Sequence, residues 1–347
     1  MYLYNSKKEC YNQFYDFYIY INIFYKAGDV LTPEMLYVYT IWQQGSFSKA
    51  AEKLYLTQPT LSMAIRKLEK ELGVPLFDRK HHPLKLTEAG EIYLDTARKI
   101  RQLEREQTQK LQDIQNLVTG TIRLGGTHYL NAYILPELLV GFNQLYPGVT
   151  LQIVENSSFA LGEMLERREL DMTFNCKPEL IQAYPHYPMF EDRILLAVPR
   201  ENPIHQQHGE IALTAWQVLE GRHLDEDCPK APLDWFADEE FILLSEGNNL
   251  HERAWQMFEE AGIHPCVKLV LNQLVTAFHL AEASMGVTFV SDRIVSPHND
   301  RLLYYPLQST IASRLFYILL PQSAYVPAAV RKLIAHIRSQ MISFSCN

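Results

Sequence analysis

The chain has 347 residues, which is long enough for two or three domains. With 47% hydrophobic and 21% charged residues, its composition is that of an ordinary soluble protein. The five cysteines are odd in number, widely scattered and without a CxxC pair, so the sequence argues against a disulfide framework and predicts a protein of the reducing cytoplasm.

Residues 1–30 differ from the rest of the chain. The stretch from Met1 to Tyr25 holds seven Tyr, three Phe and three Ile. Its apolar run is interrupted by Asp16 and Asn22 and is shorter than the ~20 residues that span a bilayer, so we predict no membrane anchor. A signal peptide is the alternative. We interpret residues 1–30 as a non-native or disordered extension, translated from a misplaced start.

Three helices are predicted between Thr32 and Leu72. Thr32-Pro33-Glu34 opens the first, which runs to about Gln44. Two more helices with a short turn between them follow Gly45, and Ser48 and Thr57 are their candidate N-caps. Apolar residues mark the inward faces of these two helices at helical spacing. They are Ala50, Ala51 and Leu54, then Leu61, Ile65, Leu68 and Leu72.

The outward face of the last helix carries hydrogen-bonding and cationic groups, which is how a helix that reads a DNA major groove is built. Its residues are Gln58, Thr60, Ser62, Met63, Arg66, Lys67 and Lys70. Eight basic and four acidic residues lie between Ser46 and Leu86, in a chain whose formal net charge is -8. The basic surface is therefore concentrated here. The alternative is a helical hairpin with a solvated charged face.

A helix stop at Gly73 and a small hairpin to Thr87 follow, with a basic, proline-containing tip. Such a wing would lay Arg79, Lys80 and Lys85 along phosphates or a minor groove. Thr87 then opens a long helix, uninterrupted by Pro or Gly from Glu91 to Val118. Its apolar seam is typical of a two-helix coiled coil, although packing along its own domain is the alternative. The seam consists of Ile100, Leu103, Gln107, Leu111, Ile114 and Val118.

After Thr119-Gly120, strands and helices alternate, which predicts a parallel sheet covered by helices. Strands are expected at 121–126, 150–155 and 170–175, and helices at 132–145 and 159–167. Ligands of such sheets bind at the carboxyl ends of strands and at helix N-termini, where an anion is favoured. Three strand-to-helix junctions fit this rule: 125–128, 244–249 and 271–276.

The N-terminal pattern closely resembles the winged helix-turn-helix of LysR-type transcriptional regulators. The matching motifs are Gly45-Ser46-Phe47, Ala50-Ala51, Leu54, Thr57-Gln58-Pro59, Leu61-Ser62, Ile65-Arg66-Lys67-Leu68-Glu69, Leu72-Gly73-Val74-Pro75-Leu76-Phe77, Arg79 and Leu86-Thr87-Glu88-Ala89-Gly90. The chain departs from the family at Met63 and Ala64, so more of the base reading falls to Gln58, Thr60, Ser62 and Arg66. The remainder, to about residue 340, has the spacing of that family's effector-binding domain.

The resemblance implies an α/β fold overall. A mainly helical winged helix-turn-helix would occupy 31–90, a linker or dimerisation helix 91–120, and a periplasmic-binding-protein-like effector domain 121–347. That domain would have two subdomains, the first at 121–190 and 296–347 and the second at 191–295.

The implied function is a cytoplasmic, DNA-binding transcriptional regulator that responds to a small, anionic effector and needs no cofactor. The expected partners are double-stranded DNA, the effector, further copies of the chain in a dimer or tetramer, and RNA polymerase. Expected DNA contacts are Ser46, Ser48, Gln58, Pro59, Thr60, Ser62, Arg66, Lys67, Lys70, Arg79, Lys80 and Lys85. The family's effector pocket is carried over to Thr127, His128, Ser245, Asn248 and Gln273.

Other functions receive less support. A solute-binding protein with an incidental helical N-terminus is the first alternative, and an enzyme the second, although the sequence contains no GxSxG, P-loop, HExxH or GxGxxG motif. His205 and His208 lack a clear carboxylate or thiol partner for a metal. A redox switch would need two of Cys176, Cys228 and Cys266 brought together.

Overall fold

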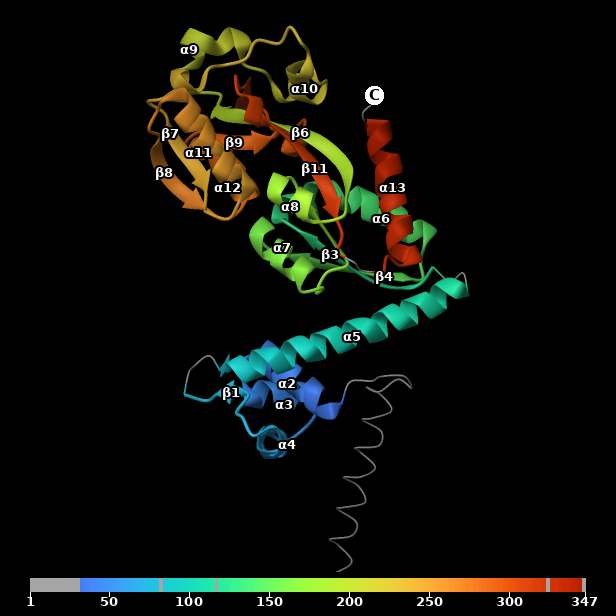
Figure 1. Cartoon of the computed structure of the whole chain (residues 1–347). Coiled ribbons are helices and arrows are strands. Elements are labelled where there is room, and N and C mark those ends of the chain that lie inside the picture. The colour runs from blue at the N-terminus through green and yellow to red at the C-terminus, as the bar shows by residue number, and fades with distance from the viewer. Residues whose placement is uncertain (1–31, 81–83, 116–117, 323–324, 345–347) are drawn as a thin grey trace, which may run out of the picture. The chain divides into compact units, whose positions relative to one another are not determined.

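The structure is a computed structural model that describes residues 32–80, 84–115, 118–322 and 325–344. The described residues form two compact units, one ending at Gln115 and the other beginning at Val118 (Figure 1). The prediction about residues 1–30 lies outside the described residues. In the part of the chain that is described, no helix is both long enough and apolar enough to cross a membrane.

The first unit is a three-helix core with a wing and a long helix. Its elements are α2 (Pro33–Gln44), α3 (Phe47–Lys53), α4 (Gln58–Leu72), β1 (Phe77–Asp78), β2 (Lys85–Leu86) and α5 (Glu88–Ile114). Val38, Ile41, Ala50, Leu61 and Ile65 are fully buried at its centre. Thr32, Thr57 and Thr87 each cap a helix by accepting a hydrogen bond from a backbone N–H.

Two details of this unit differ from the prediction. Ser46, not Ser48, is the N-cap residue of α3, and Ser48 lies inside the helix. The helix begins at Phe47, whose ring packs edge-on against Phe77. Leu72 was expected on the inward face of α4 but is 45% exposed, because it stands in the last turn, just before the left-handed Gly73 that ends the helix.

One side of α5 packs against α2. The guanidinium of Arg98 lies 4.4 Å from the ring centroid of Trp42, and that of Arg101 lies 5.0 Å from the ring of Tyr39. Gly90 in the first turn touches the wing so closely that an added Cβ would lie 2.1 Å from the carbonyl oxygen of Leu76. The other side of α5 leaves a row of apolar side chains exposed. These are Ile92, Leu103, Leu111 and Ile114.

The second unit is built on a seven-stranded mixed sheet and a separate two-stranded one. Its strands are β3 (Gly120–Gly126), β4 (Val149–Glu155), β5 (Met172–Asn175), β6 (His186–Pro199), β7 (Glu240–Leu244), β8 (Cys266–Leu271), β9 (Thr288–Ser291), β10 (Leu302–Pro306) and β11 (Ser313–Leu319). The pairs β3–β4, β3–β5 and β7–β8 are parallel, as predicted. The pairs of β6 with β9, β10 and β11 are antiparallel.

The 14-residue strand β6 belongs to both halves of this unit (Figure 1). Its first part, to Arg193, pairs with β11, and its second part pairs with β9 and β10. Strand β10 therefore belongs with β9, in the half to which residues 191–295 were assigned. The predicted boundary at 295/296, which put Leu302–Pro306 in the first subdomain, does not follow the sheet. The other domain boundaries remain predictions.

Helices cover both halves. In one half they are α6 (Leu135–Leu145), α7 (Ser158–Glu166), α8 (Pro178–Ala183) and α13 (Ala328–Phe344), and in the other α9 (His205–His208), α10 (Ala215–Leu219), α11 (Asn249–Ala261) and α12 (Leu274–Glu282). The predicted helix 132–145 instead begins with a π-helical turn, Leu130–Ile134, before α6. Pro136 accounts for the change, because it has no N–H to donate to the preceding turn.

Candidate functional site

The outward face of α4 is open to solvent, as the sequence predicted. Gln58, Pro59, Thr60, Arg66, Lys67 and Lys70 are exposed and Ser62 is half-buried. Leu61, Ile65 and Leu68 occupy the buried face. The amide of Gln58 donates to the hydroxyl of Ser62 at 2.9 Å, and the hydroxyls of Thr57 and Thr60 are 2.7 Å apart. The groups at the start of α4 are thus held in place before any ligand arrives.

The other predicted DNA contacts lie around this face. Ser46 is half-buried at the start of α3, and Ser48 is exposed in its first turn. Lys80 and Lys85 are exposed on the wing. Arg79 differs, because its guanidinium donates to Glu69 at 2.9 Å and lies 5.3 Å from the ring centroid of Phe47. Arg79 is therefore partly engaged within the protein.

A cavity of about 320 Å³ lies in the second unit. All five residues predicted for the effector pocket line it: Thr127, His128, Ser245, Asn248 and Gln273. Each of them lies where a strand ends and the next helix begins. Effector binding by these residues remains a prediction, but the fold brings them to one place.

Further lining residues were missed. They are chiefly Glu155, Asn156, Ser157, Ser158, Asn175, Cys176, Asn249, Asn272 and Arg314. The junctions β4–α7 and β5–α8 could have been found with the rule that found the others, because polar residues follow each strand there. Arg314 could not, since it lies on a strand whose antiparallel neighbours come from distant parts of the sequence.

Polar groups in the cavity bond to one another across its wall. The hydroxyl of Ser245 donates to Oδ1 of Asn272 at 2.7 Å, and Nδ2 of Asn248 donates to the carbonyl of Ser245 at 3.2 Å. His128 Nδ1 lies 3.3 Å from a carboxylate oxygen of Glu155. Most of the lining is thus amide or hydroxyl, which both donate and accept.

Two helices begin at the cavity without a side-chain cap. Asn248 is the N-cap residue of α11 and Gln273 that of α12, and in the described chain neither side chain accepts a hydrogen bond from its own helix. The first N–H groups of both helices therefore face the cavity region uncapped. N–H groups at a helix start, and the helix dipole, carry partial positive charge.

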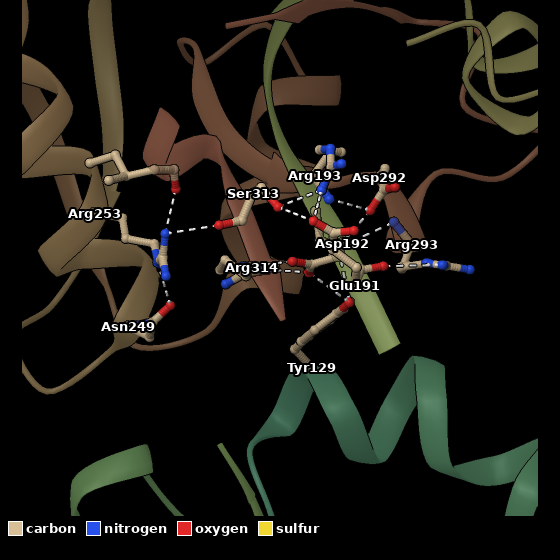
Figure 2. Close-up of polar contacts among 12 residues, drawn as sticks. Tyr129, Glu191, Asp192, Arg193, Asn249, Arg253, Asp292, Arg293, Ser313 and Arg314 are labelled. Atoms are coloured by element: carbon tan, nitrogen blue, oxygen red, sulfur yellow. Dashed lines mark hydrogen bonds and ion pairs between the residues drawn. The ribbon is translucent and has the colours of Figure 1, made fainter. Parts of the chain in front are cut away.

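Arg314 lies on the floor of the cavity and forms a buried ion pair with Asp192 (Figure 2). Tyr129 donates its hydroxyl to the same carboxylate at 3.2 Å, and Ser291 donates to it at 2.7 Å. Burial by itself lowers the pKa of Arg314, but the adjacent Asp192 outweighs this and raises the pKa above its ordinary value. The arginine is thus a permanent cation.

Arg253 joins the cavity wall to the strands behind it. Its guanidinium donates to Oδ1 of Asn249 at 3.2 Å, to the carbonyl of Ser313 at 3.1 Å and to the carbonyl of Ile311 (Figure 2). These three acceptors are neutral, so none of the hydrogen bonds named here joins Arg253 to a carboxylate. Burial lowers the pKa of this arginine from its ordinary value.

The described histidines and cysteines named as alternative metal or redox residues have other surroundings. Both ring nitrogens of His205 are used, by the Tyr305 hydroxyl at 2.7 Å and the Pro199 carbonyl at 2.8 Å. His208 stacks on Trp235 at 3.8 Å. Within the described ranges, no three His, Cys, Asp or Glu side chains gather as metal ligands, and the three described cysteines, Cys176, Cys228 and Cys266, are free thiols.

Comparisons with known proteins agree with this architecture. Residues 34–91 match the family model described as "Bacterial regulatory helix-turn-helix protein, lysR family", and residues 115–342 match "LysR substrate binding domain". The chain is 29% identical over 288 residues to an uncharacterised HTH-type transcriptional regulator, YcgK, of Bacillus subtilis, covering 82% of this chain and 87% of that protein.

It is also 30% identical over 270 residues to the HTH-type transcriptional regulator CfxR of Cupriavidus necator, covering 75% and 76% of the two chains. Among solved structures, full-length CbnR complexed with its target DNA superposes with a TM-score of 0.60 at 19% identity, covering 88% of this chain and 98% of that one. The second of the two family models alone spans more than half of the sequence. The chain therefore belongs to the LysR family and is a transcriptional regulator, with a helix-turn-helix DNA-binding domain and an effector-binding domain, rather than an enzyme.

Proposed function

We propose that α4 enters the major groove of an operator and that Gln58, Thr60, Ser62 and Arg66 read its bases. The supporting observation is that this face is exposed although the opposite face of the same helix is fully packed. The remaining residues would contact the sugar-phosphate backbone, which positions a protein but does not specify sequence. They are Ser46, Ser48, Pro59, Lys67, Lys70, Arg79, Lys80 and Lys85.

The DNA complex of CbnR supports this assignment by analogy of fold. A gel shift on the DNA upstream of the chain's own gene tests it. A shifted band that Arg66→Ala weakens is expected, whereas a solute-binding protein with an incidental helical N-terminus would give no shift. The same assay in rising salt separates backbone contacts from base contacts.

We further propose that the cavity binds a small anionic effector through Thr127, His128, Ser245, Asn248 and Gln273. Support comes from the uncapped starts of α11 and α12 and from Arg253, which bonds to Asn249 at the start of α11 and has only neutral hydrogen-bond acceptors among those named above; the charge of Arg314 is already paired with Asp192. Glu155 and Glu246 also line the cavity and are exposed. They would accept hydrogen bonds from hydroxyl or ammonium groups elsewhere on the same ligand.

A thermal-shift screen of the full chain with carboxylic acids, each beside its neutral amide, tests the charge preference. A ligand at 100 times its Kd stabilises by about 2.7 kcal/mol, which such a screen detects. Asn248→Ala and Gln273→Ala should remove the shift. Gln182→Ala, at an exposed position on α8 away from the cavity, should keep it. Equal shifts with acid and amide would contradict the anionic assignment.

We propose, finally, that the chain is a dimer or tetramer through α5. The exposed row of Ile92, Leu103, Leu111 and Ile114 supports this, since a solvated helix seldom carries such a stripe. Two α4 helices held one turn of DNA apart would read a two-fold operator. An effector that binds two arrangements of the assembly unequally would then change how the operator is held.

A further inference from the structure

The wing is too small to hold its own position. In the part of the wing that the structure describes, strands β1 and β2 have two residues each and pair as Phe77 with Leu86 and Asp78 with Lys85. A two-stranded hairpin is marginally stable in water even when it is longer. Interactions outside the hairpin must therefore set where the wing lies relative to α4.

Glu69 on α4 supplies several of these interactions. Its side chain is only 14% exposed, although the helix faces solvent on this side of the unit. Oε1 accepts hydrogen bonds from the backbone N–H of Leu76 at 2.9 Å and of Phe77 at 3.4 Å. Oε2 accepts from Arg79 at 2.9 Å. One carboxylate thus ties both ends of β1 to the helix.

On its other side, Arg79 contacts the aromatic ring of Phe47. Its guanidinium lies 5.3 Å from the ring centroid of Phe47, and that ring packs edge-on against Phe77 at 5.5 Å. Hydrogen bonds with a charged partner are about twice as strong as neutral ones, so this arrangement is stiff. Lys80 and Lys85 remain exposed on the wing, with their charges directed to solvent.

We propose that Glu69 is a positioning residue for DNA binding. It fixes the wing against α4 so that Lys80 and Lys85 reach phosphates while α4 occupies the groove. A carboxylate on a DNA-binding surface repels phosphate unless it bonds to a base or to a donor of the protein, and Glu69 accepts three hydrogen bonds from the wing. The proposal rests on the DNA-reading role proposed for α4.

The test uses the full chain and a duplex that the wild-type protein selects from a randomised DNA library. Affinity is measured as a function of salt. Glu69→Ala should weaken binding about tenfold and lower the slope of log K against log salt by about 0.9 for each phosphate that the wing no longer neutralises. Glu71→Ala is the matched control, because Glu71 lies on the same helix, is 63% exposed and pairs only loosely with Lys67 at 3.8 Å.

A double-mutant cycle separates positioning from general destabilisation. Replacing Lys80 and Lys85 together by Ala should weaken wild-type binding but have little further effect once Glu69 is Ala. Arg66→Ala should cost the same in both backgrounds, because α4 itself is unchanged. Glu69→Gln keeps an oxygen acceptor for the two backbone N–H groups, so it should fall between wild type and Glu69→Ala.

The outcomes are distinct. If the two lysine substitutions cost as much without Glu69 as with it, the positioning role is refuted. If Glu69→Ala lowers the melting temperature of the first unit below the assay temperature, the same double-mutant cycle is measured with Glu69→Gln in its place. If the wild-type chain selects no duplex, the proposed DNA-reading face fails, and with it the premise of this inference.

Discussion

Asp192 and Arg314 form an ion pair whose two side chains are 0% and 4% exposed. The pair joins β6 to β11, and Nε of the arginine donates to Oδ1 of the aspartate at 2.8 Å (Figure 2). The hydroxyls of Tyr129 and Ser291 complete the shell of the carboxylate. Two charges buried this deeply are tolerated only because each is the counter-charge of the other.

Asp192→Asn is therefore expected to destabilise the second unit by about 3–5 kcal/mol, because it leaves the charge of Arg314 buried without a counter-charge. Urea unfolding followed by tryptophan fluorescence measures the change. Asp227→Asn is the control, since Asp227 pairs with Arg222 at the exposed surface and should leave the unfolding curve in place. Replacing Asp192 by Leu and Arg314 by Met together should recover part of the loss. Failure of Asp192→Asn to shift the curve would mean that this pair is not important for stability.

Arg66→Ala and Ala51→Asp should separate the two faces of the helix-turn-helix. Arg66 is exposed, so its loss should weaken DNA binding without changing the melting temperature. Ala51 is 2% exposed, so an aspartate there buries a charge and should unfold the first unit. Thermal melts by circular dichroism and gel shifts on one duplex distinguish the outcomes. Similar melts for the two variants would show that the faces are assigned wrongly.

Leu111→Glu should dissociate the assembly. Leu111 is 55% exposed in the isolated chain and lies on the same row of α5 as Leu103 and Ile114. A charge at that position would be buried between two helices in the dimer. Sedimentation equilibrium should show a monomer for this variant and an oligomer for wild type. Thr108→Glu, at an exposed position about a sixth of a turn from Leu111 and a third of a turn or more from Leu103 and Ile114, should behave as wild type. If the wild-type protein is a monomer at all concentrations, the proposal that it assembles through α5 is wrong.

Stability of the second unit should fall in mild alkali. Burial raises the pKa of the Cys176 thiol to about 11 and, with Glu210 and Glu239, that of the Tyr305 hydroxyl to about 12. Both groups are acids that the native state keeps protonated. The unfolded chain releases a thiol proton near its ordinary pKa of about 8.5, so it binds fewer protons above that pH. The unfolding free energy must then decrease as pH rises.

Urea unfolding between pH values of about 8 and 10 measures this slope, which approaches about 1.4 kcal/mol per pH unit for one fully linked group. Cys176→Ala should flatten the slope, whereas Cys266→Ala, at an exposed thiol, should not. Equal slopes for both variants would show that a group other than Cys176 causes the loss of stability in alkali.

Local chemistry explains why much of this structure could be predicted. Thr57 with Pro59 starts α4, Gly73 ends it, and the spacing of Leu61, Ile65 and Leu68 identifies its buried face. The polar junction residues at Ser245 and Gln273 depend on the same local rules, so the sequence located part of the cavity. These features need no knowledge of distant residues.

The features that could not be predicted from the sequence depend on pairing between distant segments of the chain. Arg314 lies on the cavity floor because β11 pairs with β5 and β6, and hydrophobic periodicity does not reveal which strands become neighbours. The pairing of β10 with the second part of β6 was missed for the same reason. The engagement of Arg79 by Glu69 brings together residues ten apart on different elements, so a count of basic residues treated that arginine as free.

The continuity of β6 has a mechanical consequence. Two lobes connected by a loose tether can swing wide apart, but here one continuous strand, β6, passes from one lobe into the other. It pairs with β11 as far as Arg193, with a register shift between Phe316 and Tyr317, and with β9 and β10 beyond. A continuous strand between the lobes limits how far they can move apart. Occupation of the cavity is therefore expected to turn the lobes by small angles, and an assembly of several copies would be needed to amplify that rotation into a change that DNA can register.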